Sequence, residues 1–484
     1  MGTVSTFVAG GYQHSHRDGP ALHPAAAMAR AALGALADAG ISDLAQVDLI
    51  AAVEPLSWTY ADINQAVADE MGLETAVDRL WVPAGGTSPQ DLLHKIGPSL
   101  AAGDINCAVV CGAESMRTRR RAVKLGEDLD WPERPADVDA MRGQAPFSSE
   151  LEARHGLRAP IQTFPLFENA LRTAHGRTNE EQRQVAAAIL AANAAVAAIN
   201  PHAWFQDAPS AAEIATITPD NRMIVYPYTK RMNAIMDVDQ SAAIVVVSAA
   251  FAKQHGLLQR SAAVLGGAGA EEIWNPLQRN TYAACPAMAT AIQTALARAG
   301  VVPADIDAMD LYSCFPSPIE FALQAMGIDA DRPLSLTGGL AFAGGPGNAY
   351  VLHSLATALT RLRLQQQETL LITGIGMANT KHAATVLTGA GNVPSAATGE
   401  LSYREDRNEQ PRAVVDQADG AASIVTWTVE YDREGEPANV ILILDLPAGE
   451  RTIANMRNAV QGAGQLLAED PIGRRGWVSY DAQG

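Results

Sequence analysis

The sequence predicts an α/β fold made of two related halves, followed by a smaller β-rich unit. Two stretches of the chain repeat each other about 260 positions apart. Ala35–Gly40 is matched by Ala295–Gly300, and Gly85-Gly86 is matched by Gly344-Gly345. A repeat this long, with matched glycine loops, is typical of a duplicated α/β unit and not of a short-repeat solenoid.

In the first half, apolar runs alternate with helical spacings, which predicts strands joined by helices. Pro24–Ala39 has helical spacing and ends at Gly40, a residue type that terminates helices. The other expected elements are strands over residues 3–9, 49–53, 80–83 and 107–111, and helices over 65–72 and 89–102. This alternation favours a mostly parallel sheet that is covered on both faces.

The second half repeats this order. The expected elements are strands over residues 262–266, 308–311 and 370–373, and helices over 286–299, 318–326 and 349–364. A long insert separates the halves and contains a helical run at 179–199, and an apolar strand at 242–248 follows it. We interpret the insert as a lid or ligand-shaping subdomain; a purely structural excursion is the alternative.

The tail is β-rich, with apolar strands over 421–431, 439–446 and 477–480. Asp432-Arg433-Glu434-Gly435 between the first two is a hairpin signal. We expect a small all-β domain that forms a partial barrel. The predicted organisation is an N-terminal half (1–116 and 232–258), the insert (117–231), a C-terminal half (259–390) and an additional domain (391–484).

The composition of the chain argues against several classes of protein. The 484 residues carry a formal net charge of -18, which argues against nucleic acid as a partner because contacts to phosphates dominate that affinity. Four cysteines are too few for a disulfide scaffold. The chain shows no secretory signal and no apolar run of 18 residues, so we expect a cytoplasmic protein without a membrane segment. His14-Ser15-His16 has no carboxylate or cysteine at ligand spacing, so no metal site is predicted.

Two segments at predicted strand ends are candidates for chemistry. Gly86, Thr87 and Ser88 lie between a strand and a helix, where backbone N–H groups and the helix dipole stabilise an anion or an oxyanion. Tyr312-Ser313-Cys314 follows a strand at the sheet edge where α/β proteins bind ligands, and its thiol can act as acid, base or nucleophile. The alternatives are a tight turn and a buried structural cysteine.

Two glycine-rich segments are further candidate sites. The stretch from Thr337 to Asn348 is dense in glycine, and Gly374-Ile375-Gly376 ends the last predicted strand. Glycine allows a backbone to approach a ligand closely, which favours a binding role for both segments.

Together these residues resemble the thiolase superfamily. The duplicated halves, Gly112-Ala113-Glu114-Ser115-Met116 and the glycine-rich loop of the second half carry the resemblance. Tyr312–Phe315 and Gly344–Asn348 are most similar to thiolase-like proteins of type one, relatives of the sterol-carrier-protein thiolases that have an extra C-terminal domain. The resemblance covers essentially the whole chain. It implies two βαβαβαββ halves in a layered α-β-α-β-α arrangement and a coenzyme A thioester as substrate or ligand, with no further cofactor.

The chain departs from the thiolase pattern at the positions that this family uses for catalysis. Gly86 occupies the position of the nucleophilic cysteine, and Gly345 that of the oxyanion histidine. Tyr312 and Ser313 replace the histidine and aspartate of the loop that holds Cys314, the one thiol retained. The resemblance assigns oxyanion or substrate contacts to Gly86, Thr87, Ser88, Gly345, Asn348 and Gly376. Glycine cannot form a thioester intermediate, so ordinary ping-pong thiolysis is excluded.

Three functional hypotheses follow. The first is an atypical acyltransferase of lipid metabolism that acts on acyl-coenzyme A, transferring the acyl group or making or breaking a C–C bond, with Cys314, Tyr312 and Ser313 as its catalytic residues. The second is a non-catalytic protein that binds coenzyme A or acyl-coenzyme A, or a pathway scaffold. The third is a subunit that needs a partner protein bound through the C-terminal domain. We expect a monomer or a homodimer.

Overall fold

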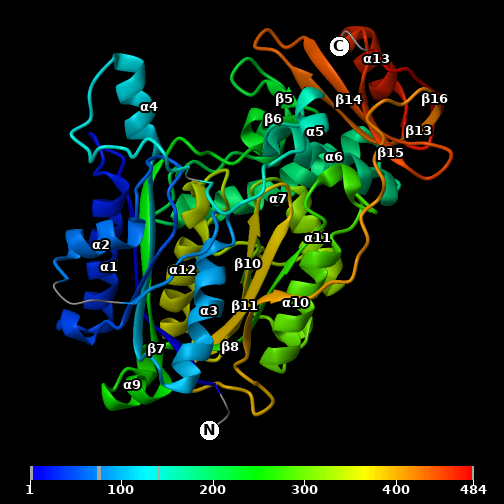
Figure 1. The fold of residues 1–484 in the computed structure, drawn as a ribbon. Helices are drawn as coiled ribbons and strands as arrows, with labels where there is room; N and C mark the ends of the chain where they lie inside the picture. Colours follow the sequence, from blue (N-terminus) through cyan, green and yellow to red (C-terminus); the bar gives the residue numbers. More distant parts are fainter. Residues whose placement is uncertain (1–3, 74–77, 140, 482–484) are drawn as a thin grey trace.

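A computed structural model describes residues 4–73, 78–139 and 141–481 (Figure 1). Two α/β halves lie side by side with α3 (Ser88–Ala102) and α12 (Tyr350–Leu364) between them, and helices of each half cover the outer faces (Figure 1). This is the layered α-β-α-β-α arrangement that the resemblance implies. The repeat is confirmed, because Gly85-Gly86 precedes α3 and Gly344-Gly345 precedes α12, the two central helices.

The N-terminal half forms one side of the main sheet. Its strands run in the order β3-β2-β4-β7-β1, with β7 antiparallel to its neighbours. The elements are β1 (Thr6–Ser15), β2 (Leu49–Ala52), β3 (Asp78–Arg79), β4 (Cys107–Ser115), β7 (Asp239–Ser248), α1 (Pro24–Ala39), α2 (Ile63–Met71), α4 (Met116–Leu125) and α9 (Ala249–Gln254).

The C-terminal half continues the sheet in the order β8-β11-β10-β9, and β12 pairs with β8. The two halves join where Phe7 and Val8 of β1 pair with Ala263 and Ala262 of β8. The elements are β8 (Ala262–Glu271), β9 (Ala308–Asp310), β10 (Thr369–Gly376), β11 (Lys381–Gly389), β12 (Leu401–Glu405), α10 (Pro286–Ala299) and α11 (Ser317–Met326).

Most predicted elements are present, and the helices end where expected. Gly40, Gly103 and Gly300 terminate α1, α3 and α10 in the left-handed conformation that glycine adopts without strain. The strand predicted over 80–83 is wrong, because the strand lies at Asp78–Arg79. Pro83 has no N–H for a ladder, and its carbonyl accepts a hydrogen bond from the Lys381 ammonium instead. The first residue of the strand predicted over 3–9 lies outside the described residues.

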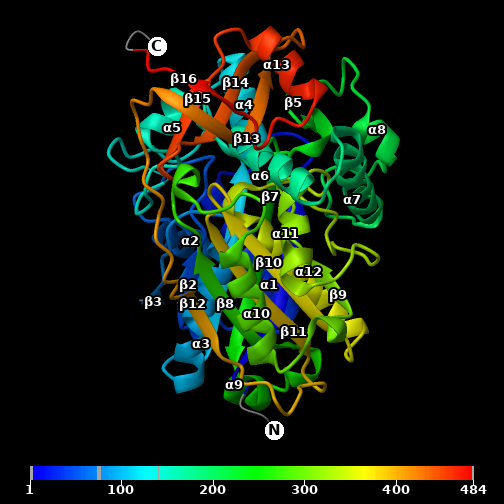
Figure 2. The ribbon, with the colours of Figure 1, turned by 90° about the vertical axis from the view of Figure 1, so that its right-hand side faces the viewer.

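The insert and the tail share one sheet, in the order β15-β14-β13-β5-β6, with β16 paired to β13 (Figure 2). This sheet is open among the described residues, with β15 and β6 at its two edges. Strands β5 and β6 come from the insert, so the insert is built into the same unit as the tail. The elements are α5 (Glu150–Arg154), α6 (Pro160–Ala174), α7 (Asn179–Ile199), α8 (Ala211–Ala215), β5 (Met223–Val225), β6 (Tyr228–Thr229), β13 (Gly420–Tyr431), β14 (Pro437–Asp445), β15 (Arg451–Asn455), α13 (Ala459–Ala468) and β16 (Arg475–Val478).

Helix α7 is the one helix in the described part of the chain that is long and apolar enough to cross a membrane. Nearly half of its most apolar stretch is buried inside the protein, including Ala187, Leu190 and Ala194. Burial of this kind is the pattern of a core helix.

Candidate active site

The candidate site is built around Gly86, at the start of α3. The carbonyl oxygen of Ile375 and the hydroxyl of Tyr312 lie so close to Gly86 that a Cβ atom there would overlap both. Gly376 lies against Gly85 and the backbone nitrogen of Gly86. The fold therefore brings Gly86 together with Tyr312 and Gly376, which lie more than 200 positions further along the chain. Their approach fills the space of a side chain at position 86.

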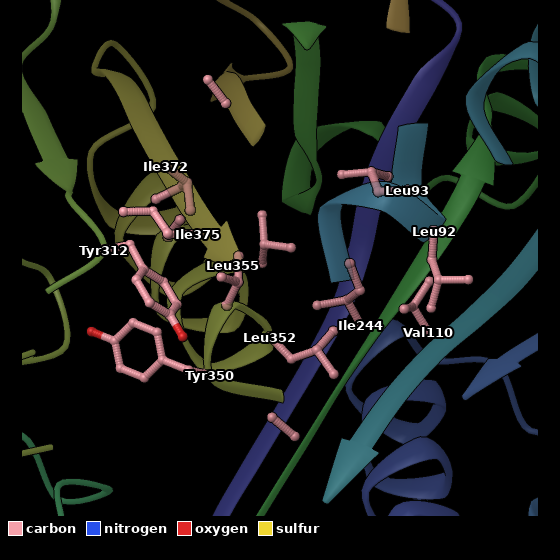
Figure 3. Close-up of a cluster of buried hydrophobic side chains, with 14 of the residues drawn as sticks. Leu92, Leu93, Val110, Ile244, Tyr312, Tyr350, Leu352, Leu355, Ile372 and Ile375 are labelled. Atoms are coloured by element: carbon pink, nitrogen blue, oxygen red, sulfur yellow. The ribbon is translucent and has the colours of Figure 1, made fainter. Parts of the chain in front are cut away.

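Tyr312 reaches Gly86 from the loop after β9. Its backbone N–H donates to the Thr373 hydroxyl over 2.8 Å, which fixes the start of the loop. Its ring meets the ring of Tyr350 edge to face, with centroids 5.5 Å apart, inside the apolar core between the halves (Figure 3). Burial raises the pKa of the Tyr312 hydroxyl well above its usual range, so the phenol stays protonated and is a hydrogen-bond donor at neutral pH.

Tyr350 belongs to a chain of hydroxyls that ends at a buried carboxyl. The Thr337 and Tyr350 hydroxyls are 2.5 Å apart, and Tyr350 donates to the Asp310 carboxyl over 3.3 Å. The backbone N–H groups of Leu336 and Thr337 also donate to Asp310. Burial raises the pKa of this carboxyl to about 6 despite these bonds. No local pattern marks Tyr350 or Asp310 as site residues; the one signal in the sequence is the position of Asp310 at a strand end, two residues before Tyr312.

Thr87 and Ser88 use their hydroxyls to hold the start of α3. Thr87 donates to the Asp91 carboxylate over 2.7 Å, and Ser88 donates to the Pro83 carbonyl over 3.3 Å. Asp91 is fully buried and pairs with Arg404 at 2.8 Å. The Asp91 carboxylate is thus held by contacts to Arg404 and to the Thr87 hydroxyl at the start of α3.

Lys381 is a buried cation beside Gly85, and no sequence pattern predicts its place there. Its ammonium donates to the carbonyls of Pro83 and Ala84 over 3.1 and 3.2 Å and lies 3.9 Å from the Asp91 carboxylate. Burial lowers its pKa. The Lys381 ammonium is 3.1 Å from where a Cβ atom at Gly85 would lie, so it sets part of the positive potential beside the loop.

Ser313 and Cys314 continue the loop beyond Tyr312. The Ser313 hydroxyl accepts a bond from the Leu340 N–H over 3.3 Å. Cys314 is partly exposed, and its carbonyl accepts from Ala234 over 3.2 Å. Burial raises the pKa of its thiol above the usual range, so the thiol is protonated in the resting protein. Its Sγ atom makes no hydrogen bond to another side chain within the described part of the chain.

Gly345 and Asn348, two more of the predicted ligand contacts, form hydrogen bonds to backbone carbonyls of other segments. The Gly345 N–H donates to the Ile235 carbonyl over 2.8 Å, and the Asn348 amide donates to the Glu54 carbonyl over 2.8 Å. Gly344 and Gly347, both at positive φ, pack directly against Gln240 and Glu114. The density of glycine in this loop is thus largely explained by positive φ and by close packing against side chains, so the loop gives less support for a ligand contact than its composition suggested.

Elsewhere in the described part of the chain, no group of three or more His, Cys, Asp or Glu side chains is arranged to hold a metal ion. His14 and His16 instead line a separate cavity together with Arg30.

Comparisons with known proteins show what this chain is similar to in sequence and fold. Residues 406–483 match the family described as "Thiolase-like protein type 1 additional C-terminal domain". The crystal structure of a monomeric SCP2-thiolase like protein type 1 from Mycobacterium smegmatis is similar over 100% of this chain and 98% of the other, with a TM-score of 0.81 and 28% identity. These two matches support thiolase-like proteins of type 1, with their additional C-terminal domain, as the family that this chain resembles. The predicted resemblance is therefore confirmed.

Two more distant structures share the fold. One is described as "Ltp2-ChsH2(DUF35) aldolase" and matches 81% of this chain and 99% of its own, with a TM-score of 0.63 and 20% identity. The other is an acetyl-CoA acetyltransferase from Syntrophomonas wolfei, which matches 80% and 99% with a TM-score of 0.60 and 16% identity. A comparison with curated proteins gives no match.

Proposed function

We propose that this protein binds acyl-coenzyme A thioesters between its two halves and acts on the acyl group without forming an acyl-enzyme. The observation that carries the proposal is the packing at Gly86, where the Tyr312 hydroxyl occupies the space of a side chain. The relatives support the ligand class, because one solved structure of this fold is an acetyl-CoA acetyltransferase. The aldolase supports C–C bond chemistry on the same fold.

The protonated Tyr312 phenol is suited to one role in such chemistry. A neutral phenol in a water-poor site donates a hydrogen bond to an oxygen that gains negative charge, as a thioester carbonyl does when the neighbouring carbon reacts. Cys314 is the second proposed group, as a carrier of a proton and not as a thiolate nucleophile, because its thiol is protonated in the resting state.

Incubation with acetoacetyl-coenzyme A tests the proposal. We expect release of free coenzyme A or a changed acyl group, measured by mass spectrometry, with no acyl label on the protein. Tyr312→Phe is expected to lower turnover about 100-fold, the usual loss for one oxyanion donor. Cys314→Ser, which keeps a proton donor of similar size, is expected to retain more activity than Cys314→Ala. Full turnover in Tyr312→Phe would contradict the assigned role.

A binding protein without turnover is the second candidate, and one observation favours it. Thr87, Ser88 and Lys381 are all bonded to neighbouring protein groups and are not free to react. For this candidate, calorimetry would show binding of acetoacetyl-coenzyme A by both the unaltered chain and Tyr312→Phe, with the thioester recovered intact.

The proposal also covers the cellular compartment and the oligomeric state of the protein. Its four cysteines are free thiols, which fits the reducing cytoplasm. The M. smegmatis relative is described as monomeric, so we propose a monomer, and the pairing of Ltp2 with ChsH2(DUF35) in the aldolase makes a partner protein the alternative.

A further inference from the structure

A buried polar network joins helices α6 and α7 of the insert to α11 of the C-terminal half (Figure 2). Glu168 of α6 and Glu320 of α11 each accept a hydrogen bond from the amide nitrogen of Gln182 on α7, both over 2.5 Å. The two carboxyl groups therefore lie within about 5 Å of each other, where two like charges disfavour ionisation. Glu168 is fully buried and Glu320 is 7% exposed, so water screens this repulsion poorly.

One cation serves both carboxyl groups. Arg177, which precedes α7, pairs with Glu320 at 2.5 Å and donates to the Gln182 side-chain oxygen over 2.8 Å. The second bond fixes the orientation of the amide, so that its N–H groups face the two carboxyls. Among the described residues, no Arg or Lys forms an ion pair with Glu168. With both carboxyls ionised, the network therefore holds one buried negative charge in excess.

Tyr228 connects this network to the loop that holds Cys314. Its hydroxyl donates to Glu168 over 2.6 Å and lies 3.1 Å from the hydroxyl of Ser317, in the first turn of α11. Its ring stacks on the ring of Phe315, the residue after Cys314, with centroids 5.3 Å apart. The contacts of the insert with Glu320 and with the Cys314 loop thus meet at Glu168.

The other charged groups near Glu168 are engaged elsewhere. The titratable groups that face it are Glu320 on α11, Tyr228 on β6 and, beyond Tyr228, the Cys314 thiol. The charged side chains on the surrounding segments contact other partners: Arg172 of α6 pairs with Asp470, Arg183 of α7 with Glu180, Glu430 of β13 accepts from Gln162, and Arg279 lies over the ring of Phe167.

A proton on Glu168 removes the excess charge. Burial, together with the negative charge of Glu320, raises the pKa of the Glu168 carboxyl from 4.5 to about 7, although its hydrogen bonds act in the opposite direction. If the insert separates from α11, the carboxyl meets water and its pKa returns to the usual range. The packed arrangement is therefore fully stabilised by this group below pH 4.5 and loses that stabilisation as the pH rises to about 7.

We propose that Glu168 and Glu320 form a proton-controlled latch between the insert and the C-terminal half. The latch is closed while the pair shares one proton, and it loosens when that proton is lost to solvent and both carboxyls are ionised. Loosening separates α6 and α7 from α11 and frees the loop that holds Cys314. The latch goes beyond the proposed function, and only its consequence for Cys314 rests on that function.

Hydrogen–deuterium exchange of the full chain at pH 5.5 and 7.5 tests the latch, with rates corrected for the intrinsic pH dependence of amide exchange. In peptides from 160–174 and 179–199 we expect exchange about 20-fold faster at pH 7.5, the increase in opening that proton release from Glu168 provides. Glu168→Gln keeps the shape of the protonated carboxyl and cannot ionise, so it should reduce this ratio to less than fivefold. Glu180→Gln, at an exposed position of α7, is the matched control and should keep the full ratio.

A second variant and a second readout complete the test. Glu320→Gln removes the neighbouring negative charge, so its ratio should be smaller than that of the unaltered chain. Iodoacetamide should label Cys314 more slowly in Glu168→Gln than in the unaltered chain at pH 7.5, because the closed latch holds the loop in place. Equal labelling rates would overturn the link to Cys314.

Equal exchange at the two pH values in the unaltered chain overturns the latch, and so does a 20-fold ratio that persists in Glu168→Gln. If Glu168→Gln does not fold, Glu320→Gln carries the test, and an unchanged ratio in that variant has the same meaning. No thioester is present in these measurements. Failure of the latch therefore leaves the proposed function intact, and a lack of turnover leaves the latch intact.

Discussion

At Gly86, the resemblance to thiolases predicts a missing nucleophile, but the sequence could not show what fills the space of the side chain. A glycine in place of a cysteine is visible in the sequence, whereas the approach of Ile375 and Tyr312 depends on how β10 and the loop after β9 meet α3. The same limit explains why Tyr350, Asp310 and Lys381 were missed. Each is an ordinary residue in its local segment and acquires a role only through contacts made far away in the chain.

Gly86→Ala is expected to destabilise the fold by about 2–4 kcal/mol, because the new methyl group would overlap the backbone carbonyl of Ile375, which cannot turn away as a side chain does. Urea unfolding measures the change. Gly391→Ala is the control, since a Cβ atom there meets nothing within 4 Å. Equal stability of the two variants would show that the segment at Gly86 is loosely packed.

The buried carboxyl of Asp310 makes stability depend on pH. Its pKa rises from 3.8 to about 6 on folding, so the folded chain holds more protons than the unfolded chain between these values. The free energy of unfolding should therefore fall as the pH rises from 3.8 to 6, by roughly 2–3 kcal/mol from this group. Asp310→Asn should remove this part of the slope, as urea unfolding at pH 4.5 and 6.5 would show. The exposed Asp329→Asn should keep it.

Among the elements, helices were predicted best because their ends are encoded locally. Pro24–Ala39 and Pro286–Ala299 match the observed helices, each with a proline at its start and a glycine after its end. Strand β11 was missed, because Lys381 and His382 open it with polar side chains that are typical of a loop. Both are buried in the structure, where they bond to groups from other segments. Strand β12 was missed because it is short and polar, and among the described residues it pairs with β8 alone.

The ion pair between Arg404 and Asp91 links β12, the strand that leads to the tail, to helix α3. Arg404→Met is expected to cost about 3 kcal/mol, because it leaves the fully buried Asp91 with only Lys381 at 3.9 Å as a cation. The exposed pair of Arg154 and Asp416 is the matched comparison, and Arg154→Met should cost less than about 1 kcal/mol. Thermal unfolding of the two variants checks the difference, and equal losses would mean that the buried pair is dispensable.

For the whole molecule, the sequence indicated the duplication and a β-rich tail but not that the insert completes the sheet of the tail. Tyr226 of the insert stacks on Trp427 of β13 at 5.1 Å, and the Thr428 hydroxyl donates to the Tyr226 carbonyl over 2.8 Å. The Asn169 amide of α6 donates to the Trp427 carbonyl over 2.7 Å. Such pairing between segments about 200 positions apart leaves no local trace in the chain.

This shared core predicts that the insert and the tail unfold together. Trp427 is completely buried, so Trp427→Ala should destabilise the unit by about 3–5 kcal/mol, whereas Trp477→Ala, which removes a side chain that is 78% exposed, should have little effect. Limited proteolysis followed by mass spectrometry distinguishes the two arrangements. In Trp427→Ala we expect cleavage to increase in both 150–231 and 406–481, since each loses the face against which the other packs. Cleavage confined to the tail would instead mean that the insert is stabilised by the thiolase-like halves alone.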